Sequence, residues 1–198
     1  HAPQDRERMV DTDTLPLTAK QRHMDERDWD RVATTFEEEI FNVPEHDTKG
    51  LIRDAIERFS APDATATDLG CGIGRTLPML AEHFAKVYAV DVSSQCLDVA
   101  SEACAELDNI VYVHADLSMD RNSYPATDTV LCINTLLNAS IDVREPLFDR
   151  TCRSVKRGGH LVLVVPALGS ALLTAYRRLQ WNLRDGMPQF RIDKVLDS

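Results

Sequence analysis

No run of 18 apolar residues occurs in this chain of 198 residues, so the sequence predicts no membrane-spanning helix. It also shows no signal-peptide pattern, although the start at His1 rather than methionine leaves processing open. Cysteines are few and form no C-x-x-C pair, and no metal site is predicted. We expect reduced thiols in a cytoplasmic protein. The five cysteines are Cys71, Cys96, Cys104, Cys132 and Cys152.

Basic residues are fewer than acidic ones. Acids outnumber bases 32 to 22, giving a formal net charge of −10. Basic residues form only two loose clusters, over residues 150–157 and 177–184. We interpret both as solvent-exposed faces of helices. Proteins that act on nucleic acids usually carry a basic face, so no nucleic-acid partner is expected.

The most informative feature present is a glycine-rich segment, Asp68-Leu-Gly-Cys-Gly-Ile-Gly-Arg75. It follows a β-prone run and leads into a helix-like segment, residues 76–83. Glycines allow a tight turn and close approach to a ligand, and a helix start presents free N–H groups. The dinucleotide fingerprint G-x-G-x-x-G needs glycine at position 75, where this chain has arginine.

Four further segments have the pattern of strands, and three of them have a polar residue at or next to their last position. Residues 86–91 end in Asp91, about twenty residues past Gly70, where a second strand brings a carboxylate beside the first turn. Residues 109–117 end in Ala-Asp-Leu, with Asp116 and Leu117. Residues 128–134 form an apolar run that ends at Asn134. A Gly-Gly stop at 158–159 precedes an apolar strand, and Gly158 is predicted to cap the preceding helix.

These five segments, over roughly residues 64–166, resemble the class I S-adenosylmethionine-dependent methyltransferases in order and spacing. The resemblance implies a Rossmann-like, doubly wound, mostly parallel α/β sheet with helices on both faces. It implies S-adenosyl-L-methionine as cofactor and S-adenosyl-L-homocysteine as product, with Asp68 toward the ammonium, Asp91 on the ribose and Asp116 near the adenine. The implied cofactor-binding residues are Asp68, Gly70, Cys71, Gly72, Gly74, Asp91, Val92, Asp116, Leu117 and Asn134.

The residues ahead of the first strand suggest three parts: an arm over 1–24, a helical cap over 25–60 and the cofactor-binding domain over 61–198. The cap contains Trp-Asp-x-x-Ala at 29–33, which resembles the helix that precedes the first motif in many small-molecule methyltransferases. We therefore expect a small-molecule acceptor and assign Phe36, Phe41 and Asn138 to its pocket. No residue stands out as a catalytic base, and Asn134 is the best candidate for orienting the acceptor.

Two other functions stay open at this stage. A catalytically silent module could keep the fold and the cofactor. A nicotinamide-dependent oxidoreductase could use the same sheet, but the chain lacks both the glycine at 75 and a Tyr-x-x-x-Lys motif.

The last residues are too few for a complete sheet of this family, which usually ends in an antiparallel hairpin. A helix is predicted over 170–184 and one short strand over 190–192, which leaves the fifth strand exposed as an edge. We expect either a longer native chain or a partner chain, such as a second copy in a homodimer, to cover that edge.

Overall fold

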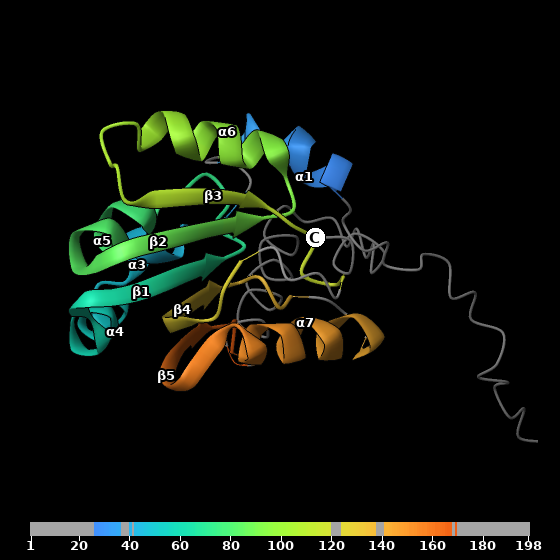
Figure 1. The fold of residues 1–198 in the computed structure, drawn as a ribbon. Helices are drawn as coiled ribbons and strands as arrows, with labels where there is room; N and C mark the ends of the chain where they lie inside the picture. The colour runs from blue at the N-terminus through green and yellow to red at the C-terminus, as the bar shows by residue number, and fades with distance from the viewer. Residues whose placement is uncertain are drawn as a thin grey trace, which may run out of the picture.

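The computed structural model describes residues 26–36, 40, 42–119, 124–137, 141–167 and 169. This part of the chain contains five strands and six labelled helices (Figure 1). In chain order they are α1 (Glu26–Ala33), α3 (Val43–His46), α4 (Leu51–Phe59), β1 (Ala61–Leu69), α5 (Leu77–His83), β2 (Phe84–Asp91), α6 (Ser94–Ala103), β3 (Ile110–His114), β4 (Thr127–Ile133), α7 (Ile141–Arg153) and β5 (Val155–Val164).

The strands form one parallel sheet in the order β3-β2-β1-β4-β5. This confirms the predicted doubly wound α/β fold. The chain first builds outward from β1 through β2 to β3 and then crosses to β4 on the other side. The switch point therefore lies between β1 and β4, and the carboxyl ends of these strands flank the crevice in which such sheets bind ligands.

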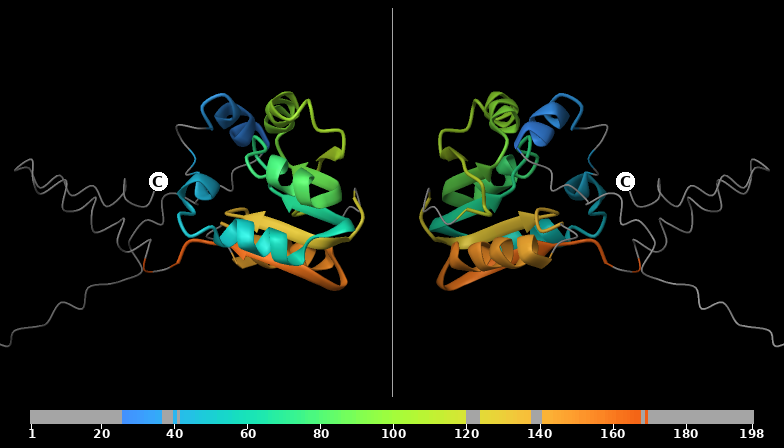
Figure 2. Two further views of the ribbon diagram at one scale, coloured as in Figure 1. Left: turned by 90° about the vertical axis from the view of Figure 1, so that its left-hand side faces the viewer. Right: turned by 90° about the vertical axis from the view of Figure 1, so that its right-hand side faces the viewer.

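Both faces of the sheet are covered, as Figures 1 and 2 show. One core contains Ile56 of α4, Leu80 of α5 and Leu97 of α6 against the sheet. The opposite core contains Leu147 of α7. Strand residues alternate between the two cores: Leu131 belongs to the first, and Val130 and Cys132 to the second. This explains why the central strands read as continuous apolar runs.

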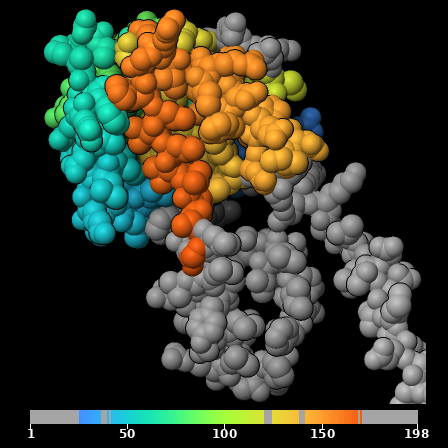
Figure 3. All heavy atoms as spheres, turned by 90° about the horizontal axis from the view of Figure 1, so that it is seen from below, coloured from blue at the N-terminus to red at the C-terminus, as the bar shows by residue number. Residues whose placement is uncertain are grey.

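Strand β5 begins earlier than predicted, and the role assigned to Gly158 is wrong. Helix α7 ends at Arg153, and β5 already pairs with β4 at Val155. The register then shifts, because Thr129 pairs with His160. Gly158, with φ +81°, lies in this irregularity and not at a helix end. Figure 3 shows β5 at the surface with α4 on one side and α7 on the other.

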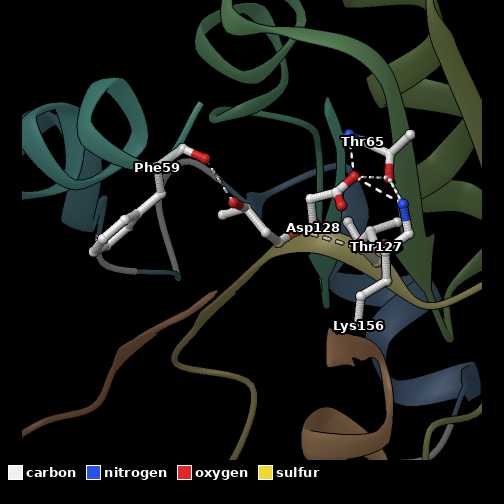
Figure 4. Close-up of polar contacts among 7 residues, drawn as sticks. Phe59, Thr65, Thr127, Asp128 and Lys156 are labelled. Carbon is white, nitrogen blue, oxygen red and sulfur yellow. Dashed lines mark hydrogen bonds and ion pairs between the residues drawn. The ribbon is translucent and has the colours of Figure 1, made fainter. Parts of the chain in front are cut away.

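The amino end of β4 lies at the opposite end of the parallel strands from the glycine-rich segment. A polar cluster fixes it there (Figure 4). One carboxylate oxygen of Asp128 accepts from the Thr65 N–H at 2.8 Å, the Thr65 hydroxyl at 2.8 Å and the Lys156 ammonium at 2.9 Å. These contacts lower the pKa of Asp128 to about 2, with the Lys156 hydrogen bond the largest cause. The cluster joins β1, β4 and β5 and so has a structural role.

The helix predicted over 170–184 and the strand predicted over 190–192 lie outside the described residues. None of the helices in the described ranges combines the length and the apolar character needed to cross a membrane.

Candidate cofactor-binding site

The glycine-rich segment forms a loop across the carboxyl ends of β1 and β2. The N–H groups of Gly70 and Cys71 both donate to the Val90 carbonyl, at 2.8 and 3.1 Å. Three backbone positions have positive φ: Gly70 (+69°), Gly72 (+52°) and Gly74 (+82°). L-residues with side chains rarely adopt this conformation, so the loop requires its glycines.

Space restricts the loop as strongly as backbone conformation does. A Cβ at Gly70 would collide with the side chain of Thr135, whose hydroxyl donates to the Leu69 carbonyl at 2.8 Å. A Cβ at Gly72 would lie 2.7 Å from Cζ of Phe36. The Phe36 ring therefore stands directly against the middle glycine, which brings the N-terminal segment onto the loop.

Asp91 joins the loop to the start of α6. Its Oδ2 accepts from the Gly72 N–H at 2.8 Å, and its Oδ1 accepts from the Ser93 N–H at 2.9 Å. The side chain is buried, and burial raises the pKa of Asp91 while the backbone hydrogen bonds act against that rise. Each carboxylate oxygen has a second lone pair, so Asp91 can hold the loop and still accept from a ligand hydroxyl.

Asp68 is a buried carboxyl group of the site with a strongly shifted pKa. It is 2% exposed and accepts a hydrogen bond from the Thr76 hydroxyl. Burial is the main cause that raises the pKa of Asp68 to about 7; the Thr76 hydrogen bond opposes it and the Asp91 charge adds to it. A carboxyl group that is half ionised near neutrality, beside a second buried carboxylate, favours a cationic ligand.

A pH dependence follows from Asp68. The proton is held more tightly in the folded protein than in the unfolded chain, so this group contributes stability at low pH that is lost as pH rises from about 4 to about 7.

A cationic ligand favours the ionised form, so S-adenosylhomocysteine should release up to about one proton on binding below pH 7. Calorimetry in two buffers of different ionisation enthalpy measures this release. The Asp68→Asn variant should release no such proton. Equal proton release by the wild-type protein and the variant would contradict the placement of Asp68 beside the cationic group of the ligand.

The third acidic position lies beyond the strand that was predicted to carry it. β3 ends at His114, and Asp116 follows in a turn where its Oδ1 accepts from the N–H and hydroxyl of Ser118, at 2.8 and 2.6 Å. Leu117 is buried next to it. The Val92 carbonyl accepts from Nε2 of His114 at 2.9 Å, which places Val92 between β2 and β3.

Asn134 follows β4 with φ +57°, and among the described residues it is the single non-glycine position with positive φ. Its N–H donates to the Val164 carbonyl at 2.9 Å. Asparagine tolerates this left-handed conformation better than most residues, and such positions gather at functional sites. The neighbouring Thr135 contacts the glycine loop, so Asn134 lies at the switch point as predicted from its strand-end position.

Helix α1 lies beside α6, toward the carboxyl ends of the strands (Figure 1). Asp30 accepts from the Ser93 hydroxyl at 2.6 Å, and Ser93 itself caps α6. Glu26 pairs with His114 at 3.0 Å. These contacts were missed in the sequence; the one available signal was Ser93, a preferred helix-capping residue directly after Asp91.

The predicted acceptor pocket is only partly described. Phe36 lies against Gly72, as stated above, whereas Phe41 and Asn138 lie outside the described residues. His160 stacks on Phe59 with ring centroids 4.0 Å apart and pairs with the amino end of β4. It is therefore far from the strand ends that carry the site.

The geometry suits a nucleoside-type cofactor with a cationic end. The glycines of the loop pack closely against neighbouring side chains, the Asp91 carboxylate has lone pairs for ribose hydroxyls, and the buried Asp68 suits an ammonium group. All lie at the carboxyl edge of the parallel sheet. Fold and site thus define a cofactor-binding α/β domain.

Comparison with known proteins names the family. The family model described as methyltransferase domain matches residues 66–159. No curated protein sequence is significantly similar to the chain. Matching structures include the DhpI–SAM–HEP complex (21% identity, 81% of this chain and 69% of that chain, TM-score 0.56). Another is the N-methyltransferase NodS from Bradyrhizobium japonicum WM9 with S-adenosyl-L-homocysteine (18% identity, 68% of this chain and 72% of that chain, TM-score 0.53). A third is an S-adenosylmethionine-dependent methyltransferase from Clostridium acetobutylicum ATCC 824 (20% identity, 66% of this chain and 56% of that chain, TM-score 0.54).

The structural likenesses show the shared fold, and the match over 66–159 covers the glycine loop and the ends of β1 to β4. The match assigns residues 66–159 to the methyltransferase domain family, and with the fold it supports a class I S-adenosylmethionine-dependent methyltransferase, with S-adenosylmethionine as cofactor and S-adenosylhomocysteine as product. The family match decides between the two cofactors considered from the sequence.

Proposed function

We propose that this methyltransferase transfers the methyl group of S-adenosylmethionine to a small-molecule acceptor. The observation that carries the proposal is the 2.8 Å bond from the Gly72 N–H to Asp91, which fixes the glycine loop beside the ribose-binding carboxylate. The cofactor supplies a strongly electrophilic methyl group, so the protein has to orient the acceptor and exclude water.

The protein groups have distinct roles in this proposal. Asp91 accepts from the ribose, Asp116 and Leu117 flank the adenine, and Asp68 faces the ammonium group. Asn134, held in a left-handed conformation at the switch point, orients the acceptor. Phe36 forms part of the acceptor pocket, together with Phe41 and Asn138, which remain assignments from the sequence.

A small acceptor fits the segment above the site better than a polymer does. Helix α1 is fixed at Ser93 and His114, and Phe36 beyond it reaches Gly72. This segment therefore lies over the carboxyl edge, where a nucleic acid or a protein substrate would need access. The net charge of −10 also disfavours a polyanionic substrate.

The test uses cofactor carrying a tritium-labelled methyl group and a cell extract separated into small-molecule and macromolecular fractions. Label should move to the small-molecule fraction, and a Gly72→Val protein should transfer none. Label in nucleic acid or protein would contradict the acceptor class. Cofactor binding without any transfer would instead support a catalytically silent module.

A further inference from the structure

The pattern Asp-x-Ser occurs at two neighbouring strand ends on the carboxyl edge of the sheet. Asp91-Val-Ser93 begins at the last residue of β2, and Asp116-Leu-Ser118 lies just after β3. In both turns, Oδ1 of the aspartate accepts from the serine N–H two positions on, at 2.9 Å in the first and 2.8 Å in the second. The two turns thus share one local geometry, and their serine hydroxyls can be compared directly.

The two hydroxyls have different partners. The Ser118 hydroxyl donates back to its own turn, to the same Oδ1 of Asp116, at 2.6 Å. The Ser93 hydroxyl donates instead to Oδ1 of Asp30 on helix α1, also at 2.6 Å. A serine hydroxyl has one proton to donate, so Ser93 cannot give it to Asp91 at the same time. Contact with α1 therefore distinguishes the Asp91 turn from the Asp116 turn.

Asp30 is well placed to keep this proton. Its Oδ1 also accepts from the Gln95 N–H at 3.4 Å, in the first turn of α6, where the free N–H groups of a helix favour a carboxylate. Ser93 is fully buried, and its oxygen accepts from the Cys96 N–H at 3.0 Å. The hydroxyl is thus fixed on both its accepting and its donating side.

We propose that Asp30 is a positioning residue for the cofactor: by accepting the Ser93 proton, it keeps Oδ1 of Asp91 available to a ribose hydroxyl. This inference rests on the proposed function, in which Asp91 holds the ribose. Without Asp30, the Ser93 hydroxyl would turn back to Asp91, as the hydroxyl of the second Asp-x-Ser turn does. It would then occupy the lone pair that the ribose needs. Helix α1 thereby acts on the cofactor site through one hydrogen bond.

Calorimetry with S-adenosylhomocysteine tests this role in two steps. Asp30→Ala should weaken binding about fivefold, because a charge-assisted bond to the ribose then competes with the Ser93 hydroxyl. Alanine preserves the helical tendency of α1. Adding Ser93→Gly removes the competing hydroxyl, and glycine is tolerated at a helix N-cap. The double variant should bind at least about threefold more tightly than Asp30→Ala, although it has lost one more hydrogen-bonding group.

Two single variants complete the comparison. Asp30→Asn keeps an oxygen that can accept the Ser93 proton, so it should bind more tightly than Asp30→Ala. Asp28→Ala is the matched control, because it also removes an acid from α1, one that pairs with Arg31 on the same helix. It should change the affinity less than about twofold.

A purely structural role of Asp30 predicts a different result. If Asp30 only holds α1 in place, the double variant will bind no more tightly than Asp30→Ala, which overturns the proposal. Undiminished affinity in Asp30→Ala also overturns it and leaves the proposed function intact. Failure of the wild-type protein to bind S-adenosylhomocysteine would overturn both. Should Asp30→Ala not fold, Asp30→Leu, which is similar to aspartate in shape, takes its place with and without Ser93→Gly.

Discussion

Replacing Gly72 with valine should abolish cofactor binding while leaving the sheet folded. Gly72 has φ +52°, a conformation that β-branched residues avoid, and its Cβ would lie 2.7 Å from Cζ of Phe36. The valine side chain would also fill the surface against which the cofactor lies. We expect the affinity for S-adenosylhomocysteine, measured by calorimetry, to fall at least about a hundredfold, or about 2.7 kcal/mol.

Gly158→Val is the control for this experiment. Gly158 has φ +81°, so valine there carries a comparable backbone strain, but nothing lies within 4 Å of its Cβ. The position belongs to the irregular start of β5, away from the loop. Gly158→Val should therefore lower the melting temperature and retain binding. Equal loss of binding in both variants would show that general destabilisation, and not blockage of the loop, explains the Gly72→Val result.

Replacing Asp91 with alanine should weaken cofactor binding at least about tenfold. The carboxylate is expected to accept from both ribose hydroxyls, in charge-assisted hydrogen bonds worth about 1.5–3 kcal/mol each. The structure adds a second effect, because Asp91 also satisfies the Gly72 and Ser93 N–H groups. Its loss frees two buried donors, so Asp91→Ala should also lower the free energy of unfolding, and binding should be compared at a temperature where the variant is folded.

Two further variants separate these effects. Asp98→Ala removes one charge from the exposed face of α6 and should leave the affinity unchanged. Asp91→Asn keeps one acceptor oxygen and should lose less affinity than Asp91→Ala. Wild-type affinity in a folded Asp91→Ala protein would show that the ribose is held elsewhere.

The parts of the molecule that the sequence predicts are those set by local pattern. Continuous apolar runs mark the buried strands, and the polar residues at their ends, such as Asp91 and Asn134, fall at one edge because parallel strands share their direction. The glycine loop can also be predicted from local sequence, because glycine at position 72 indicates a positive φ without knowledge of any distant contact. The sheet and the line of candidate residues could therefore be predicted together.

The missed features depend on contacts between distant segments. Thr135 covers Gly70 from 65 positions away, and Asp30 caps α6 through Ser93, 63 positions away. The sequence around Thr135 or Asp30 does not indicate which distant residue each one contacts. Gly158 shows the opposite error: a Gly-Gly pair after a helix resembles a cap, but pairing with β4 from Val155 onward takes the segment into the sheet. Tertiary pairing thus overrode a local signal.

The central claim is that the loop from Asp68 to Arg75 binds an S-adenosyl ligand by its methionine part and adenosine. Calorimetric titration of the wild-type protein with S-adenosylmethionine, S-adenosylhomocysteine and NAD tests it most directly. We predict saturable binding of both adenosyl compounds and no heat of binding with NAD, because G-x-G-x-G with Arg75 lacks the glycine that a pyrophosphate-binding turn needs. Tight NAD binding with no response to either adenosyl compound would contradict the account.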